Sequence, residues 1–167
     1  MLKYASWIHG NAVQLEDPSG ILVKKVGMGT EMQFNTLVPG ISPPGTWCHI
    51  AIPSPVIVND ARLKLQKVFL LFQTGQHAAI DNLHIFDGPR RIFMQDVVPG
   101  RNSSARRTGN HMQAIDAQNT FTLPAPVEIS FGVSISFTFR PVALTTSLGR
   151  ADPEGKLLIT TAGADFV

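Results

Sequence analysis

The sequence predicts an all-β protein, an antiparallel β-sandwich of the jelly-roll kind. Residues 128–140 (EISFGVSISFTFR) alternate between apolar and small or polar side chains, the period-two pattern of a β-strand with one buried face. Other apolar or alternating runs recur at intervals of about 8–12 residues between turn residues, as in a sandwich or barrel. No long segment has the 3.6-residue period of an amphipathic helix.

Turn residues separate the predicted strands along the chain. Residues 16–20 (EDPSG) and 87–89 (DGP) have tight-turn composition, and residues 39–45 (PGISPPG) predict a rigid loop. Residues 75–77 (GQH) are interpreted as the turn of a β-hairpin, and residues 56–65 as a short helix or a turn. The predicted strands are 4–9, 12–15, 21–26, 31–38, 47–52, 63–73, 79–86, 90–98, 119–123, 128–140 and 156–162.

The alternating segment at residues 128–140 is predicted to be one long strand. At about 3.3 Å per residue it would span about 40 Å, so we expect it to bend near Gly132 or to pair with two neighbours in succession. Its apolar face is expected in the core, together with Val68, Leu70 and Phe72 or their alternates. The predicted core residues of this strand are Ile129, Phe131, Val133, Ile135, Phe137 and Phe139.

Length and composition favour one domain at residues 1–167 and exclude several classes of protein. Only 16% of residues are charged, against about a quarter in typical domains, which favours oligomer contacts or two packed sheets. The net charge of +2 is too small to imply a nucleic-acid partner. The longest apolar run, 68–72 (VFLLF), is far shorter than the roughly 20 residues of a membrane span. The N-terminal segment lacks signal-peptide features, so we expect a protein that is cytoplasmic or released without a signal peptide.

Two Trp-x-His units are the candidate ligand-binding residues. Trp7 and His9, like Trp47 and His49, are two residues apart and would share one face of a strand. If the two strands were neighbours, these side chains would form one aromatic and polar patch of the kind that binds sugars. The alternative is that both tryptophans fill the core and the histidines lie at its edge.

The basic loop at residues 90–110 is a candidate anion-binding segment. Arg101, Arg106 and Arg107 lie among Gly, Ser and Asn residues, and guanidinium groups suit phosphate or carboxylate. Nucleic-acid binding would favour aromatic residues interleaved with the basic ones, but none lies between Arg101 and His111. The alternative to an anion-binding segment is a solvated loop.

Catalytic and metal-binding patterns are weak. The five histidines show no metal-ligand spacing, so no metal site and no cofactor are predicted; they are His9, His49, His77, His84 and His111. Cys48 is the only cysteine, which excludes an intrachain disulfide, and in a strand it would face away from His49. No nucleophile elbow or phosphate-binding loop is present, so we expect no enzyme activity.

Four segments together resemble a family of small, β-rich microbial proteins of unknown function. They are SWIHGNAVQLEDP at the start, WCHIAIPSPVIV, the pair VFLLFQT and IDNLHIFDGPRRI, and GVSISFTF. The resemblance spans most of the chain and implies one domain. It brings no catalytic or binding residues.

Two functional classes are compatible with these observations. The preferred one is a non-enzymatic binding module, most consistent with carbohydrate as the ligand. The other is a self-assembling structural protein, in which the low-charge Ser/Thr face of the strand at 128–140 packs on another subunit, as a homo-oligomer.

Overall fold

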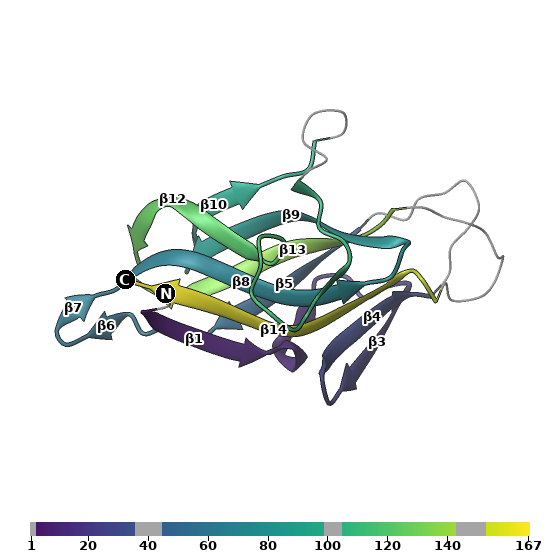
Figure 1. Cartoon of the computed structure of the whole chain (residues 1–167), viewed down its shortest axis with the longest axis horizontal. Coiled ribbons are helices and arrows are strands. Elements are labelled where there is room, and N and C mark those ends of the chain that lie inside the picture. The colour runs from purple at the N-terminus through teal and green to yellow at the C-terminus, as the bar shows by residue number, and fades with distance from the viewer. Residues whose placement is uncertain (1–2, 36–44, 99–104, 143–152) are drawn as a thin grey trace.

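A computed structural model, which describes residues 3–35, 45–98, 105–142 and 153–167, shows two antiparallel β-sheets packed face to face (Figure 1). The larger, sheet A, has the order β11-β8-β14-β4-β3, with β1 also paired to β14 and β12 to β8. Its strands are β1 (Tyr4–His9), β3 (Ile21–Val26), β4 (Gly29–Phe34), β8 (Lys64–Thr74), β11 (Asn110–His111), β12 (Thr120–Glu128) and β14 (Lys156–Phe166).

The second sheet, sheet B, has the order β10-β9-β13-β5-β2. A separate two-stranded hairpin, β6 (Ile57–Val58) with β7 (Ala61–Arg62), lies at the end of the molecule where both termini are found (Figure 1). A short 3-10 turn (Gly10–Ala12) follows β1. The strands of sheet B are β2 (Gln14–Leu15), β5 (Thr46–Ile52), β9 (Ala78–Asp87), β10 (Arg90–Gln95) and β13 (Val133–Pro141).

The connectivity is that of a jelly roll. Sheet A contains the row β4-β14-β8-β12 and sheet B the row β5-β13-β9-β10, so each sheet interleaves strands from both halves of the chain. The chain passes from one sheet to the other after β1, β2, β4, β5, β8, β10, β12 and β13. The two nested Greek keys of a jelly roll require this order, and the predicted fold class is therefore confirmed.

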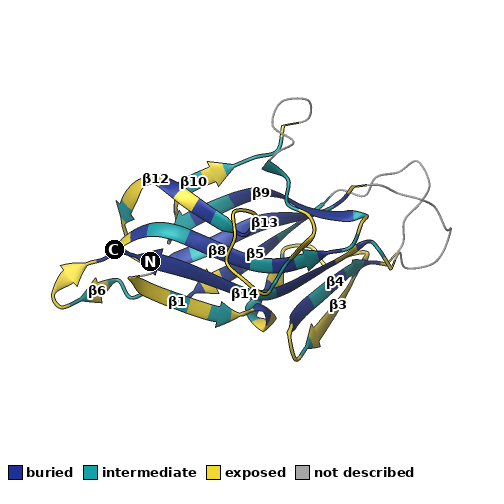
Figure 2. Ribbon diagram, in the orientation of Figure 1, coloured by how far each residue is buried: buried dark blue, intermediate teal, exposed yellow. Residues whose placement is uncertain are grey.

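The core lies between the sheets and consists mainly of aliphatic and phenylalanine side chains. Figure 2 shows buried residues concentrated in β8, β9, β13 and β14. Val68, Leu70 and Phe72 face it from sheet A, as predicted, and the rings of Phe34 and Phe139 stack across it with centroids 4.3 Å apart. Complete burial of a phenylalanine or leucine side chain stabilises the fold by about 1.5–3 kcal/mol, so this cluster is the main source of stability.

The prediction of one continuous strand over residues 128–140 is wrong, because the strand begins only at Val133. β12 ends at Glu128 in sheet A, and β13 begins at Val133 in sheet B. The intervening residues form a corner, in which Ile129 remains buried but the side chain of Phe131 is 74% exposed. Phe131 therefore does not belong to the core, although Ile129, Val133, Ile135, Phe137 and Phe139 do.

The carboxylate of Asp87 explains this corner. It is buried at the end of β9 and accepts hydrogen bonds from the backbone N–H groups of Ser130 (3.0 Å), Phe131 (2.8 Å) and Gly132 (3.1 Å). Three consecutive N–H groups that converge on one carboxylate cannot also pair with a neighbouring strand. The chain therefore leaves the sheet here, and Gly132 adopts a φ of +140° that favours glycine.

The pKa of Asp87 is lowered. Burial acts to raise it, but the hydrogen bonds from Phe131, Ser130 and Gly132, with one from Arg90, outweigh the burial. The Arg90 guanidinium donates to the second carboxylate oxygen at 3.1 Å. A buried carboxylate with four donors is stable as an anion, so the corner depends on a charge within the fold.

One further sequence prediction requires correction, and for residues 56–65 the turn rather than the helix is the alternative that the structure shows. Residues 63–73 and 79–86 do not form a hairpin, because β8 pairs with β14 in sheet A whereas β9 pairs with β13 in sheet B. The segment 75–77 is instead a crossover between the sheets. Residues 56–65 contain no helix; they form β6 and β7 around a turn at Asn59 and Asp60, both with positive φ. Most of the loop predicted at 39–45 lies outside the described residues.

We expect Asp87→Asn to lower the free energy of unfolding by about 2–4 kcal/mol at pH 7, because charge-assisted hydrogen bonds are lost from a buried site. The folded-state pKa is lowered, so the stabilisation is present above the unfolded-state pKa of about 3.9 and is lost as the pH falls through the folded value. Urea unfolding of both proteins between pH 7 and pH 2.5 measures this. The difference between them should shrink at the acid end; Asp60→Asn, in an exposed turn, is the control.

Phe131 and Phe137 have the same parity in the sequence but opposite surroundings, so their alanine variants should differ. Phe137→Ala should cost about 3–5 kcal/mol because it opens a cavity in the core. Phe131→Ala should cost less than about 1 kcal/mol, since its ring is mostly in solvent. Chemical denaturation compares the two, and equal losses would contradict the observed break between β12 and β13.

Candidate functional site

The outer face of sheet B carries a hollow whose floor is the small-residue face of β13. Ser136 lies opposite His49 of β5 on one side and His84 of β9 on the other. Small side chains on the central strand between larger ones on its neighbours leave a depression of about 210 Å³. The residues that line this depression, here called the first hollow, are Glu16, Trp47, His49, His84, Phe86 and Ser136.

Aromatic rings form the wall of the first hollow. Trp47 lies with its ring centroid 4.9 Å from that of His84, at an interplanar angle of 45°. His84 in turn lies 6.3 Å from Phe86. Trp47 is only partly exposed, so its indole is fixed against the sheet and offers an open part of its surface to the hollow.

Each histidine of the first hollow is fixed by a polar partner. His84 Nε2 is 2.7 Å from the Asp96 carboxylate, which accepts its hydrogen. His49 Nδ1 is 2.9 Å from the Ser136 hydroxyl, and its Nε2 is 3.6 Å from the Glu16 carboxylate. Imidazole rings fixed in this way meet a ligand in a defined orientation, without the entropy loss of ordering a free side chain.

The site contains a serine, a histidine and a carboxylate, yet the geometry is not that of an activated nucleophile. Ser136 lies in the middle of β13 and is paired with strands on both sides. Its backbone is therefore part of the ladder, whereas a serine nucleophile needs a sharp turn and free N–H donors for an oxyanion. The arrangement is suited to binding through hydrogen bonds and ring faces.

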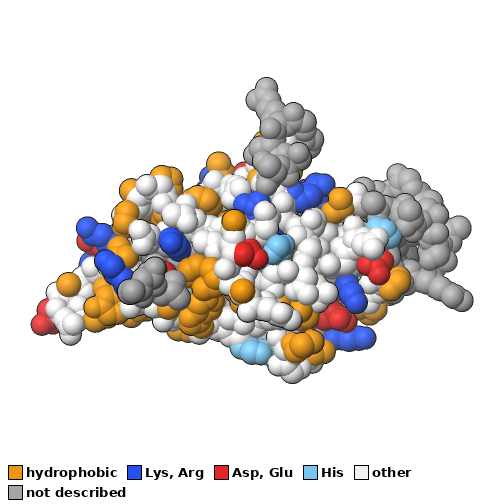
Figure 3. Space-filling view, in the orientation of Figure 1, with side chains coloured by type: hydrophobic (Ala, Val, Ile, Leu, Met, Phe, Trp, Pro, Cys, Tyr) orange, Lys and Arg blue, Asp and Glu red, His pale blue; other side chains and the backbone are white. Residues whose placement is uncertain are grey.

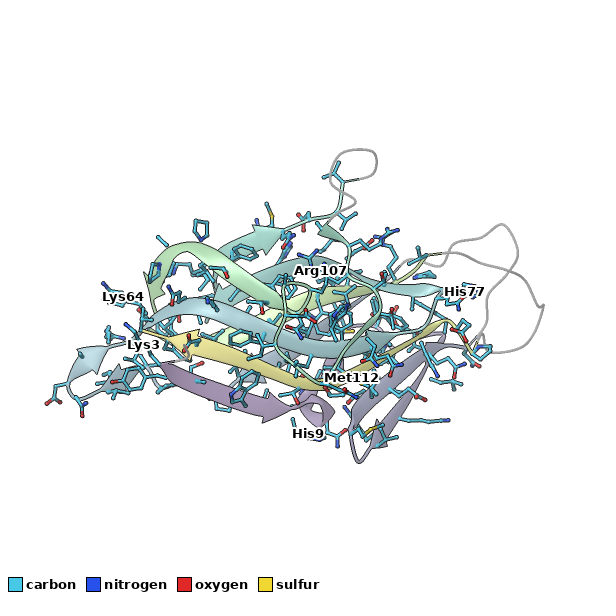
Figure 4. All side chains as sticks on the ribbon, in the orientation of Figure 1. Lys3, His9, Lys64, His77, Arg107 and Met112 are labelled. Atoms are coloured by element: carbon cyan, nitrogen blue, oxygen red, sulfur yellow. The ribbon has the colours of Figure 1, made fainter. Side chains whose placement is uncertain are left out.

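The structure does not bring the two Trp-x-His units together. Trp7 lies in β1 of sheet A, on the opposite outer face from Trp47. Its indole is 38% exposed, stacks on Phe69 at 5.3 Å, and lies directly over Gly163 of β14. His9 lies at the end of β1 (Figure 4), where its Nδ1 accepts the backbone N–H of Asn11. A role in binding for Trp7 and His9 stays a prediction.

Hydrophobic atoms also gather over β1 and β14 on the face of sheet A (Figure 3). Trp7 covers Phe69 there, and the two rings form a small hydrophobic cluster outside the main core. The indole packs against the backbone of β14 because residue 163 has no side chain.

Of the three predicted anion-binding arginines, the two that the structure describes, Arg106 and Arg107, have separate environments. Arg106 makes a two-pronged ion pair with the buried Asp81, at 2.7 and 2.8 Å, and this hydrogen bonding raises the pKa of Arg106 against the opposing effect of burial. The Arg107 guanidinium lies over the ring of Phe121, 5.6 Å from its centroid (Figure 4). Arg101 lies outside the described residues. Arg106 thus binds an anion of its own chain, and binding of an external anion stays a prediction.

Within the described part of the chain, no three His, Cys, Asp or Glu side chains converge as metal ligands would. The described histidines have other neighbours, such as Asp116 for His111. Cys48 faces the core beside Met32, and burial raises the pKa of its thiol to about 12, so it is a neutral core residue. Among these residues there is also no helix long and apolar enough to cross a membrane.

Sequence reasoning found Trp47 and His49 but missed their neighbours. Glu16, His84, Phe86, Ser136 and Asp96 come from four separate segments that only the strand register brings together. The alternation at residues 128–140 did predict that Ser136 lies on the outer face. Which side chains face Ser136 across the sheet could not be predicted without the register.

Comparison with protein families gives one match, to DUF6623, a family of unknown function, over residues 1–142. The protein belongs to this family. The resemblance proposed from the sequence is thereby confirmed, and the matched region includes every residue of the first hollow. Comparison with curated proteins finds no match.

Among solved structures, the chain is similar to the C-terminal CBM6 of LamC, a marine laminarinase from Zobellia galactanivorans. The superposition covers 97% of this chain and 99% of that one, with a TM-score of 0.41 and 10% sequence identity. At this level the similarity assigns no function to the DUF6623 protein.

The contact between Trp7 and Gly163 can be tested by adding a methyl group. Gly163→Ala would place a Cβ atom against the indole of Trp7, and we expect it to destabilise the fold by about 1–3 kcal/mol and to shift the tryptophan fluorescence. Gly27→Ala is the matched control, because its added Cβ would meet open space. Thermal unfolding and emission spectra of both variants measure the difference; a neutral Gly163→Ala would contradict the close packing.

Proposed function

We propose that the DUF6623 protein is a non-enzymatic carbohydrate-binding module, with the first hollow of sheet B as its binding site. The observation that carries the proposal is the combination of a ring wall, Trp47 and Phe86, with fixed polar edges of His49 and His84 over a floor of small hydroxylated residues. A sugar ring has apolar C–H faces and a rim of hydroxyl groups, and it needs both kinds of surface at once.

The polar groups of the first hollow include both donors and acceptors. The carboxylate of Glu16 accepts hydrogen bonds, and the serine hydroxyl and the imidazole groups do either. Sugar hydroxyls also donate and accept, so each finds a partner here. The hollow is open and shallow, which suits exposed sugar units rather than a fully enclosed small molecule.

The other function proposed from the sequence is self-assembly through the Ser/Thr face of β13. It requires that this face be exposed to solvent in a single chain. Within one chain, Ser136 is only 7% exposed and Thr138 only 3% exposed, because larger residues on β5 and β9 flank them. A recessed floor of this kind suits a ligand that enters the hollow better than a flat sheet of a second subunit. Homo-oligomer formation remains a prediction.

The two tryptophans provide a matched pair of variants for the test. On a glycan array, wild type and Trp7→Ala should bind the same glycans, whereas Trp47→Ala should lose at least about tenfold in affinity, because it removes the ring wall. Circular dichroism confirms that both variants are folded. Absence of binding by the wild type across a broad array, or full binding by Trp47→Ala, would overturn the proposal.

A further inference from the structure

A second hollow adjoins the first on the same face of sheet B. It has a volume of about 290 Å³ and is lined by Ile8, Ala12, Gln14, His49, Ala51 and Ser134. β2 spans only Gln14 and Leu15, so within the described ranges no strand pairs with β5 on that side beyond His49. Ile8 of β1 and Ala12 of the 3-10 turn close the space that a longer β2 would have filled.

The two hollows are adjacent on the outer face of sheet B and share one lining residue, His49. Their floors are Ser136 and Ser134, successive outward residues of β13 and therefore about 7 Å apart along the strand. The hydrogen bond between His49 and Ser136 and the neighbouring Glu16 carboxylate hold the imidazole in place between the two hollows. The two adjacent hollows, here together called the groove, have lining residues that range from Phe86 on β9 to Gln14 on β2.

The chemistry of the second hollow differs from that of the first. Its wall consists of the aliphatic side chains of Ile8, Ala12 and Ala51. Its polar groups are the amide of Gln14, the hydroxyl of Ser134 and the edge of His49, and among the described residues no Asp, Glu, Lys or Arg lines it. An uncharged sugar unit fits this lining, because a buried charge would lack a countercharge there.

We propose that the groove binds a linear, neutral oligosaccharide of at least two units, one in each hollow, with His49 in contact with both. This inference rests on the proposed function, since it uses the same ligand class. It adds that affinity depends on chain length: a monosaccharide occupies the first hollow alone, and the next unit gains the contacts with Gln14, Ala51 and Ser134.

The test uses the full chain and a defined set of probes. These are neutral mono-, di-, tri- and tetrasaccharides of glucose, galactose, mannose, xylose and N-acetylglucosamine, presented on an array and then measured by titration calorimetry. For the sugar series that binds, we expect affinity to rise at least about tenfold from the monosaccharide to the di- or trisaccharide, and then to level off.

Variants separate the two hollows. Ala51→Leu fills the second hollow from an exposed position, so it should reduce trisaccharide affinity to the monosaccharide value and leave monosaccharide binding unchanged. Gln14→Ala should cause a smaller loss in the same direction. Ala5→Leu, at an exposed position of β1 on the other sheet, is the matched control and should bind as wild type does.

The outcomes distinguish the two proposals. Equal affinity for the monosaccharide and its oligomers, with no effect of Ala51→Leu, would overturn the second subsite while carbohydrate binding stands. No binding of any probe would overturn carbohydrate binding and the subsite with it. Loss of oligomer affinity in Ala51→Leu alone, with Ala5→Leu unaffected, supports both.

Discussion

The architecture depends on the carboxylate of Asp87, because it fixes where the chain leaves sheet A and enters sheet B. Its hydrogen bonds to three consecutive N–H groups end the path of β12 and start β13 opposite the end of β9, where Val133 pairs with Asp87 itself. Since the side-chain period of a strand is two, a shift by one residue would turn the small face of β13 toward the core. One buried charge therefore determines which residues floor the groove.

The same register explains why the site is polar at its floor and aromatic at its sides. β13 is the central strand of sheet B, so its outward Ser134 and Ser136 have a neighbour on each flank. The flanking strands supply His49, Ala51, His84 and Phe86 at those levels. The inward residues of β13 are at the same time the centre of the core, so stability and the shape of the site come from opposite faces of one strand.

The fold class was predictable because alternation and turn residues are local signals. The exception at Phe131 arises from an interaction between residues 44 positions apart in the sequence, and no local pattern reveals such a partner. The hairpin assigned to residues 63–86 was wrong for a related reason, since a Gly-containing turn does not show whether the next strand joins the same sheet or the opposite one. Only part of the candidate site could be predicted. Trp47 and His49 stand out in the sequence, but the side chains that line the hollow beside them depend on the strand register.

The sequence contains few charged residues, and several of its carboxylates are buried inside the fold with specific partners. Asp81, Asp87 and Asp165 are all buried, and their partners are Arg106, the corner N–H groups and the backbone N–H of Lys3. Arg106 is thereby committed to an internal ion pair, which the sequence alone could not distinguish from an exposed anion-binding residue. The Asp81 carboxylate also lies 3.1 Å from Nε of Arg140, so its buried charge is compensated by two guanidinium groups.

The exposed ring of Phe131 has a consequence for how the protein can evolve. The corner is held by backbone donors and by Asp87, so the side chain at position 131 contributes nothing to the hydrogen bonds that define it. Gly88, with a φ of +55°, lies beneath this side chain, and a Cβ atom there would come within 2.9 Å of the Cβ of Phe131. Position 131 can thus accept many residue types. The residue types at positions 87, 88 and 132, by contrast, are restricted together by the backbone geometry of the corner.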